Sequence, residues 1–198
     1  MRLNSFFSKI VIILLVLMLT ALYALYEKKK YYTYDDHLSN ELFLKKLPDF
    51  KSLEMPNAQL INSYDLLKES SGLFVHIWGT WCAPCEKEMP EFLKYAQSVE
   101  GKGVRFVLVA VNDNEVKVKK FMERFALPSN VKVVLDHENK VMDLFGTLKV
   151  PETFLFDATG KHVNKFIGPQ EWGQESYQTR LEFWLNTQNY VDRKIETH

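Results

Sequence analysis

The chain of 198 residues carries 25 basic and 25 acidic side chains, so its net charge is zero, and 46% of its residues are hydrophobic. This balance excludes a disordered protein, and the sequence has no basic stripe with interleaved aromatic residues to indicate a nucleic-acid partner. The part that follows residue 30 is long enough for one domain with its own core and too short for two.

The first predicted element is an apolar segment near the N-terminus. Ile10–Tyr26 contains 17 residues, of which only Thr20 is polar. This length lies at the short end of the roughly 17–25 residues that span a bilayer. We therefore expect a signal-anchor in residues 1–30, followed by a tether in residues 31–46. A cleaved signal peptide is the alternative, although its best cleavage site, after Ala24, has a bulky residue two positions upstream.

Positive charge flanks this segment on both sides. Arg2 and Lys9 precede it and Lys28–Lys30 follow it, so the positive-inside rule gives close to a tie. The first hydrophobic segment of a chain usually directs export. We therefore expect a single-pass protein of the cytoplasmic membrane, with the main domain on the periplasmic or extracytoplasmic side.

Strand and helix patterns alternate in the rest of the chain, residues 47–198. Apolar, β-branched runs predict strands at Phe74–Trp78, Val104–Val111 and Val131–Leu135. Helical spacing and capping residues predict helices at Asn62–Leu67, from the cysteines to about Val99, and at Glu115–Phe125, His137–Phe145 and Glu171–Gln188. A hairpin is expected from Thr153–Phe156 and Val163–Ile167. This order predicts an α/β domain with a largely parallel sheet, to which the hairpin adds antiparallel strands.

Cys82 and Cys85 are the only cysteines of the chain. A structural zinc site needs four ligands, and the five histidines are scattered along the sequence. A structural disulfide between these positions would close almost no loop and would restrict the unfolded chain little. A CxxC pair that follows a strand and opens a helix is instead typical of a thioredoxin-like redox motif. We expect no metal site and no cofactor.

The position of the pair at a helix N-terminus assigns each thiol a role. Unpaired N–H groups and the helix dipole stabilise a thiolate at Cys82, which makes it the attacking nucleophile. Pro84 lies in the first turn, where its missing N–H costs nothing. Cys85 is almost one turn further along and is suited to resolve the mixed disulfide. Trp78 and Trp81 are expected to line the site around the cysteines, with ordinary core packing as the alternative for either.

The sequence around these cysteines resembles the membrane-anchored thioredoxin-like proteins of the TlpA, ResA and CcmG (DsbE) group. The resemblance runs from Leu47 to about Trp172. Its matching pieces are Pro48-Asp49-Phe50, Trp78-Gly79-Thr80-Trp81-Cys82-Ala83-Pro84-Cys85, Glu88, Pro90, Val109–Asp113, Asp136 and Gly146–Asp157 with the turn at Gly160. It implies a thioredoxin-like fold with a central mixed sheet flanked by helices.

The resemblance also implies a substrate-binding surface. Val150-Pro151 matches the loop whose X–Pro bond is cis and faces the cysteines, and Val150 would offer backbone hydrogen bonds to an extended substrate. Glu152 is then a candidate substrate-contacting acid, with a solvated loop charge as the alternative. The residues expected to bind substrate are Trp81, Pro84, Val150, Pro151 and Glu152.

Two further residues are candidates for proton transfer. Glu88 lies three residues after Cys85 on one helix face. The group carries an acid here, and burial beside a thiol would raise its pKa and make it a proton carrier. The alternative is an exposed helix glutamate. His76 stands six residues before Cys82, where it would relay a proton or titrate near neutral pH, or else be a hydrogen-bonded core residue.

The function implied is that of an extracytoplasmic thiol–disulfide oxidoreductase, which reduces selected disulfides through Cys82 and Cys85. By resemblance its partners are apocytochrome c or its maturation factors, a thiol-reducing membrane electron donor and the lipid bilayer. The alternatives are an oxidant of exported proteins, a holdase, a copper-binding module using the two thiols, or an inactive scaffold.

Overall fold

The computed structural model of the protein describes residues 8–25, 44–56, 59–136, 138, 140–180 and 182–183. These residues fall into two compact units, Met1–Phe43 and Leu44–His198. Most of the predicted tether, residues 31–43, and the predicted end of the last helix, residues 184–188, lie outside the described residues.

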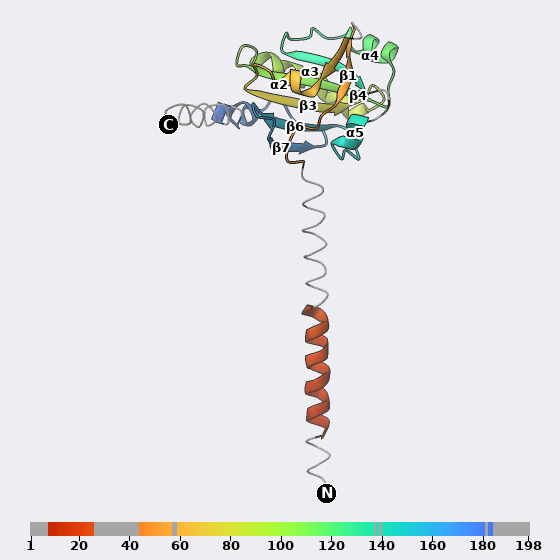
Figure 1. Ribbon diagram of the computed structural model, residues 1–198, viewed down its shortest axis with the longest axis vertical. Helices are drawn as coiled ribbons and strands as arrows, with labels where there is room; N and C mark the ends of the chain where they lie inside the picture. Colours follow the sequence, from red (N-terminus) through yellow and green to blue (C-terminus); the bar gives the residue numbers. More distant parts are fainter. Residues whose placement is uncertain are drawn as a thin grey trace. The chain divides into compact units, whose positions relative to one another are not determined.

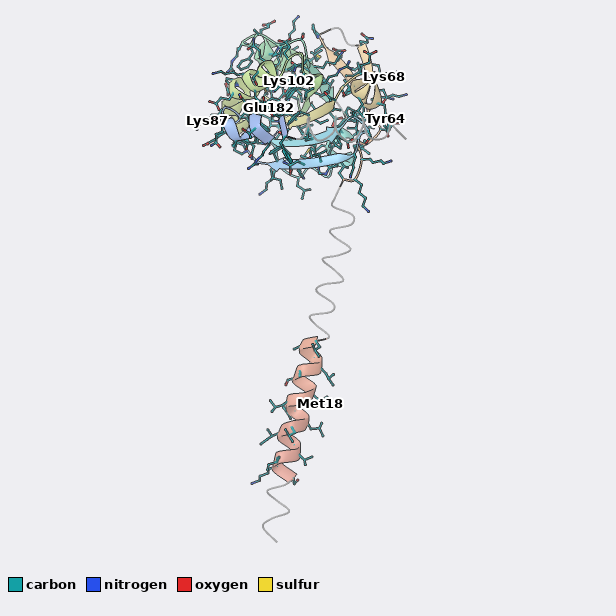
Figure 2. The ribbon with its side chains drawn as sticks, turned by 90° about the vertical axis from the view of Figure 1, so that its left-hand side faces the viewer. Met18, Tyr64, Lys68, Lys87, Lys102 and Glu182 are labelled. Carbon is teal, nitrogen blue, oxygen red and sulfur yellow. A yellow bond between two sulfur atoms is a disulfide. The ribbon has the colours of Figure 1, made fainter. Side chains whose placement is uncertain are left out.

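The first unit contains one apolar helix, Ser8–Leu25, of 18 residues. Its side chains are exposed along its whole length, as the label on Met18 shows for one of them (Figure 2). The helix is long and apolar enough to cross a bilayer. A signal sequence would meet the same criterion, so this unit is consistent with both interpretations of the N-terminal segment.

Within the described residues of the second unit, seven strands form one mixed sheet (Figure 1). The strands are β1 Lys51–Met55, β2 Gln59–Asn62, β3 Gly72–Trp78, β4 Val104–Val111, β5 Val131–Asp136, β6 Glu152–Asp157 and β7 His162–Ile167. Their order across the sheet is β2-β1-β5-β4-β3-β6-β7. β3, β4 and β5 pair in parallel and the remaining pairs are antiparallel. The predicted α/β domain with a mixed sheet is confirmed. The expectation that the sheet is largely parallel is wrong, because β1 and β2 add antiparallel strands on the side opposite the hairpin.

Helices cover both faces of this sheet because alternate residues of each buried strand point to opposite sides. The helices are α2 Ser63–Leu67, α3 Ala83–Ser98, α4 Glu115–Met122 and α5 Lys140–Leu144, with further helical residues at 175–180 and 182–183. α3 and α4 pack with Phe74 and Phe106 on one face. α2 and α5 pack with Val75 and Val107 on the other.

The pairing of β3 brings two distant loops to one edge of the sheet. β3 runs parallel to β4 and antiparallel to β6, with Ile77 opposite Glu152. The end of β3 therefore lies beside the beginning of β6. The turn that carries Cys82 follows β3 and Pro151 immediately precedes β6, so both loops lie at this edge.

Two features differ from the sequence-based expectation. β1 and β2 were not predicted, because these short runs mix polar and apolar residues without strict alternation. The last helix begins at residue 175 rather than at Glu171, because residues 172–174 form turns in which Trp172 is buried. An ion pair of 2.9 Å joins Glu182 of this helix to Lys102 after α3 (Figure 2).

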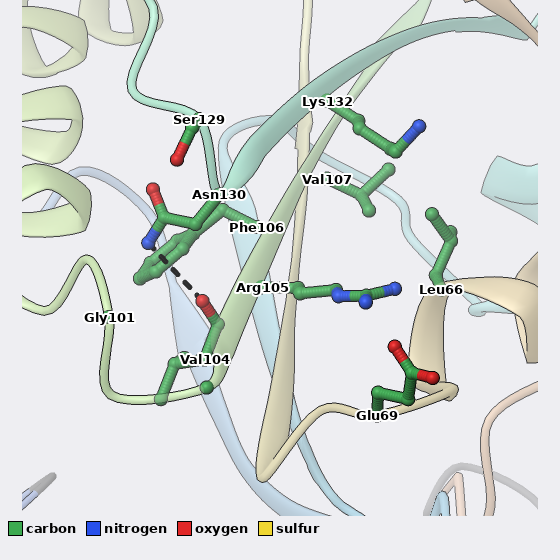
Figure 3. A pocket seen from close by; sticks show the side chains of 11 residues that line it. Leu66, Glu69, Gly101, Val104, Arg105, Phe106, Val107, Ser129, Asn130 and Lys132 are labelled. Atoms are coloured by element: carbon green, nitrogen blue, oxygen red, sulfur yellow. Dashed lines mark hydrogen bonds between the residues drawn. The ribbon is translucent and has the colours of Figure 1, made fainter.

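A cavity of about 450 Å³ opens at the other end of the parallel strands (Figure 3). Val104 and Arg105, at the start of β4, line it together with Asn130, whose amide donates to the Val104 carbonyl oxygen. The cysteines follow the carboxyl end of β3. This cavity is therefore remote from them.

Candidate active site

The two cysteines form a disulfide at the N-terminus of α3. Cys82 is the N-cap residue, and its Sγ accepts a hydrogen bond of 3.3 Å from Cys85 N. Cys85 is completely buried, whereas Cys82 keeps slight exposure between the exposed residues Trp81 and Ala83. An N–H group of the first helical turn is thus directed at the sulfur that was predicted to attack.

The two tryptophans of the motif differ in their surroundings. Trp81 is 56% exposed, and its Nε1 donates to the Val111 carbonyl oxygen at 3.0 Å. Trp78 is buried and packs on Phe121, with ring centroids 5.0 Å apart. Core packing is therefore confirmed for Trp78, and Trp81 is the one that forms a surface beside the disulfide. Pro84 is also exposed at this surface.

The loop before β6 faces the disulfide. Its Val150–Pro151 bond is cis, as predicted. The carbonyl oxygen of Val150 lies 3.7 Å from Cys82 Sγ, a distance at which a reduced Cys82 thiol could donate to it. Leu148, in the same loop, is 84% exposed. The backbone of this loop thus lies beside Cys82.

Glu88 is a buried acid on α3, one turn beyond Cys85. Its Oε2 accepts hydrogen bonds from Gln170 N at 2.8 Å and Trp172 Nε1 at 3.1 Å. Burial raises the pKa of Glu88 to about 7, and these two hydrogen bonds oppose the rise. The alternative of an exposed helix glutamate is wrong. Both protonation states of this carboxyl are populated near neutral pH.

A surface cavity of about 690 Å³ lies beside Glu88. Pro84 and Lys87 line it from α3, and Pro169 and Gln170 line it from the segment after β7. Because Glu88 also lines it, a proton can pass between this carboxyl and solvent without crossing the core.

His76 lies in the middle of β3 and is completely buried. Its Nδ1 is 2.8 Å from Thr153 Oγ1, and its Nε2 is 3.7 Å from Glu88 Oε1. Burial lowers the pKa of His76 to about 3. The expectation that it titrates near neutral pH is therefore wrong, and the interpretation as a hydrogen-bonded core residue is confirmed. A role in proton transfer remains a prediction.

Glu152 begins β6 and is buried, with its Oε1 3.0 Å from Lys165 Nζ. The alternative of a solvated loop charge is wrong, because the side chain is buried and paired with Lys165. Contact with a substrate would require this ion pair to open. The ion pair with Lys165 therefore competes with the predicted substrate contact of Glu152.

Replacing Lys165 with methionine is expected to lower the free energy of unfolding by about 2 kcal/mol at pH 8, because the Glu152 carboxylate stays buried without its cation. The cost falls below the roughly 3–5 kcal/mol of a fully buried pair because the Lys165 side chain is 27% exposed. Denaturant titration of the full chain measures it. The matched control Lys165→Met/Glu152→Gln should recover most of the loss, and equal losses in both variants would contradict the assignment.

Sequence reasoning missed the residues that hold Glu88. Gln170 and Trp172 follow the last strand, and they approach α3 only in the folded chain. The sequence offered one signal, Trp172, which is a large apolar residue at the otherwise polar start of the predicted last helix. Among the described residues, no group of three His, Cys, Asp or Glu side chains forms a metal-binding arrangement.

Comparison with known proteins matches the sequence of the chain to one family. A family model described as Redoxin matches residues 45–181. Thiol-disulfide oxidoreductase ResA of Bacillus thuringiensis (strain Al Hakam) is 32% identical over 138 residues, covering 69% of this chain and 77% of the relative. ResA of Bacillus subtilis (strain 168) is 35% identical over 116 residues, covering 59% and 63%.

Solved structures show the same fold. A putative thiol:disulfide interchange protein DsbE from Chlorobium tepidum superposes with a TM-score of 0.61 at 23% identity, covering 71% of this chain and 96% of its own. StoA from Bacillus subtilis superposes with a TM-score of 0.53 at 22% identity, covering 69% and 96%.

Proposed function

The chain belongs to the Redoxin family and, within it, to the thioredoxin-like thiol–disulfide oxidoreductases of the ResA and CcmG group, and from this premise we propose that it reduces selected protein disulfides through a Cys82–Cys85 cycle. One observation carries the proposal. The Cys82–Cys85 disulfide lies at the N-terminus of α3, with the buried acid Glu88 one turn further along.

In the proposed cycle the reduced protein supplies two electrons. The Cys82 thiolate attacks one sulfur of the substrate disulfide, so that a mixed disulfide forms and one substrate thiolate leaves. The Cys85 thiolate then attacks Cys82 Sγ, which releases the second substrate thiolate and forms the Cys82–Cys85 disulfide. The substrate gains two electrons, and each of its thiolates takes a proton.

Glu88 is the proposed proton carrier for Cys85. Cys85 is buried and must lose its proton before it attacks, and a carboxylate one turn away can accept it. With a pKa of about 7, Glu88 can accept the proton and pass it to solvent through the adjacent cavity. The same group would return a proton to Cys85 when the disulfide is reduced again.

The proposed substrate surface consists of the exposed residues Trp81 and Pro84 and the backbone of Val150 beside Pro151. Glu152 is a further candidate contact. The proposed clients are the haem-binding cysteines of apocytochrome c or the maturation factors that handle them, as the resemblance to the group implies. A membrane protein of the thiol-reducing type would restore the electrons.

The proposed location is the outer face of the cytoplasmic membrane. Residues 1–30 would remain as an uncleaved anchor, residues 31–46 would form the tether, and residues 47–198 would form the catalytic domain. The apolar helix Ser8–Leu25 supports an anchor of this kind. The positive charges on both sides of the segment do not decide its orientation. The proposed extracytoplasmic placement rests on the tendency of a first hydrophobic segment to direct export and on the resemblance.

The test is the reduction potential of the Cys82–Cys85 couple, measured with the full chain in detergent by equilibration with glutathione and dithiothreitol. A reductant is expected to have a potential near or below that of thioredoxin, about −270 mV. A potential near that of DsbA, about −120 mV, would overturn the proposed direction and identify an oxidant.

A further inference from the structure

Two buried polar atoms face each other without a hydrogen-bond partner in the core of the domain. His76 Nε2 and Glu88 Oε1 are 3.7 Å apart, and neither has a hydrogen-bond partner within the described part of the chain. This distance exceeds the usual limit for a hydrogen bond. A side-chain movement of less than an ångström would bring the two atoms into range, and leaving both unpaired in the core is costly.

The other polar atom of each side chain is already held. Gln170 N and Trp172 Nε1 donate to Glu88 Oε2. His76 Nδ1 pairs with Thr153 Oγ1, and the imidazole stacks on Phe92 with ring centroids 4.5 Å apart. These contacts leave His76 Nε2 and Glu88 Oε1 as the two atoms available to each other.

A neutral imidazole can pair with a carboxyl group in either protonation state. One ring nitrogen donates and the other accepts, and which does which depends on the tautomer. A threonine hydroxyl can also donate or accept. Because burial keeps His76 neutral, the partners on its two sides select the tautomer.

We propose that His76 is a positioning residue that changes tautomer with the protonation state of Glu88. When Glu88 is protonated, its Oε1–H donates to His76 Nε2, and Nδ1–H donates to Thr153 Oγ1. When Glu88 is ionised, Nε2–H donates to Oε1, and the Thr153 hydroxyl donates to Nδ1. The two states differ by one net proton. The Oε1 proton leaves for the Cys85 thiolate or for solvent, while the ring gains a proton at Nε2 and releases one from Nδ1, so the imidazole is neutral in both states.

This arrangement deepens the proposed function, since it concerns the proton that Glu88 exchanges with Cys85. The buried carboxyl has a partner before and after it gives up its proton, which keeps its pKa near neutrality. A partner that only donates would favour the ionised form, and an apolar residue would favour the protonated form.

Other ionisable groups surround the pair. They are Cys85 on α3, Tyr177 on the last helix and, at the mouth of the adjacent cavity, Lys87, Glu91 and Glu171. In the oxidised protein Cys85 does not titrate. Burial raises the pKa of Tyr177 above its ordinary value, so this phenol is neutral at physiological pH. Glu88 is therefore the group whose titration should drive the change at His76.

The direct test follows the tautomer of His76 by 15N NMR, using the oxidised full chain in detergent with labelled histidine. His76→Asn identifies the signals. As the pH rises through the pKa of Glu88, the pyrrole-like shift is expected to move from Nδ1 to Nε2, without an imidazolium form. The Glu88→Gln variant should abolish this change. A single tautomer throughout the titration, or a charged ring near neutral pH, would overturn the proposal.

A second measurement follows the pKa of Glu88 through its 13C carboxyl shift. His76→Leu removes the partner and is expected to raise this pKa by about one unit or more, because a hydrogen bond to a carboxylate is stronger than one to the neutral acid. His76→Asn keeps a donor and an acceptor and should leave the pKa near the wild-type value. If His76→Leu does not fold, the tautomer measurement on the wild type still tests the proposal.

Both readouts use the oxidised protein and need no substrate. An oxidising potential would overturn the proposed direction of the reaction without altering the tautomer change. Conversely, a fixed tautomer would leave the dithiol cycle intact. The two proposals can therefore fail separately.

Discussion

Replacing Cys82 with serine is expected to reduce disulfide reduction to the uncatalysed background. The serine hydroxyl is not ionised at neutral pH and cannot form a mixed disulfide, and Cys85 is completely buried and cannot replace it as the attacking thiol. Turnover of a model disulfide with dithiothreitol as electron donor measures the loss. Retention of substantial turnover would contradict the assignment of Cys82 as nucleophile.

The matching variant, Cys85→Ser, is expected to stop the cycle one step later. Cys82 can still attack, but nothing resolves the product, so one equivalent of mixed disulfide should accumulate per chain. Mass spectrometry under non-reducing conditions detects it, and Cys82→Ser/Cys85→Ser is the control without a covalent link. A holdase or a scaffold would instead bind the substrate equally well with and without Cys85.

Replacing Glu88 with glutamine is expected to slow resolution by Cys85 about 100-fold at pH 7, the lower part of the range for general acid–base catalysis. The amide keeps an oxygen for Gln170 and Trp172 but cannot accept a proton from the thiol. Single-turnover kinetics separate resolution from the initial attack. Glu86→Gln is the matched control, because Glu86 is exposed on the same helix. Equal rates for wild type and Glu88→Gln would contradict the role.

The same variant should change how stability depends on pH. The folded pKa of Glu88, about 7, lies above the ordinary 4.5, so the folded state binds the proton more tightly and stability falls as pH rises through this interval. The full effect corresponds to about 3 kcal/mol. Glu88→Gln should therefore match the wild type near pH 4 and exceed it by about this amount at pH 8. Denaturant titrations of the oxidised protein measure the difference. If the pKa of Glu88 had its ordinary value, the two proteins would not differ in this way.

The titration of His76 makes the free energy of unfolding depend on pH in the opposite direction. The effect of Glu88 is therefore measured as the difference between Glu88→Gln and the wild type, because both contain His76. The folded pKa of His76, about 3, lies below the ordinary 6.5, so stability is lost as pH falls from 6.5 towards 3. Between about pH 4.5 and 6.5 the two effects largely cancel. The free energy of unfolding of the wild type should therefore be nearly constant over this pH interval, although both groups titrate in it.

The sequence predicted the central elements well because their signals are local. β3, β4 and β5 are nearly continuous apolar runs, and α3 begins at a cysteine and a proline that mark a helix start. The hairpin of β6 and β7 was likewise predicted from its turn. These patterns depend on neighbours in the chain and are readable without the fold.

The features that sequence reasoning missed depend on distant pairing. β1 is a strand because Leu53 pairs with Leu135 of β5. Nothing within the five residues of β1 indicates this partner. The environment of Glu88 is similar, since its hydrogen-bond donors lie 82 and 84 residues along the chain. Position relative to Cys85 suggested an acid with a function, but its burial could be established only from the structure.

The two donors to Glu88 both come from the segment that follows β7. A shortened version of the protein ending at Gly168 would contain every strand of the described sheet and both cysteines, yet it would lack Gln170 and Trp172. The Tyr177 hydroxyl donates in turn to the Gln170 side chain at 2.6 Å. A fragment designed for crystallisation, or a fusion joined at this end, should therefore extend beyond Tyr177, because a complete sheet does not guarantee a complete acid–base site.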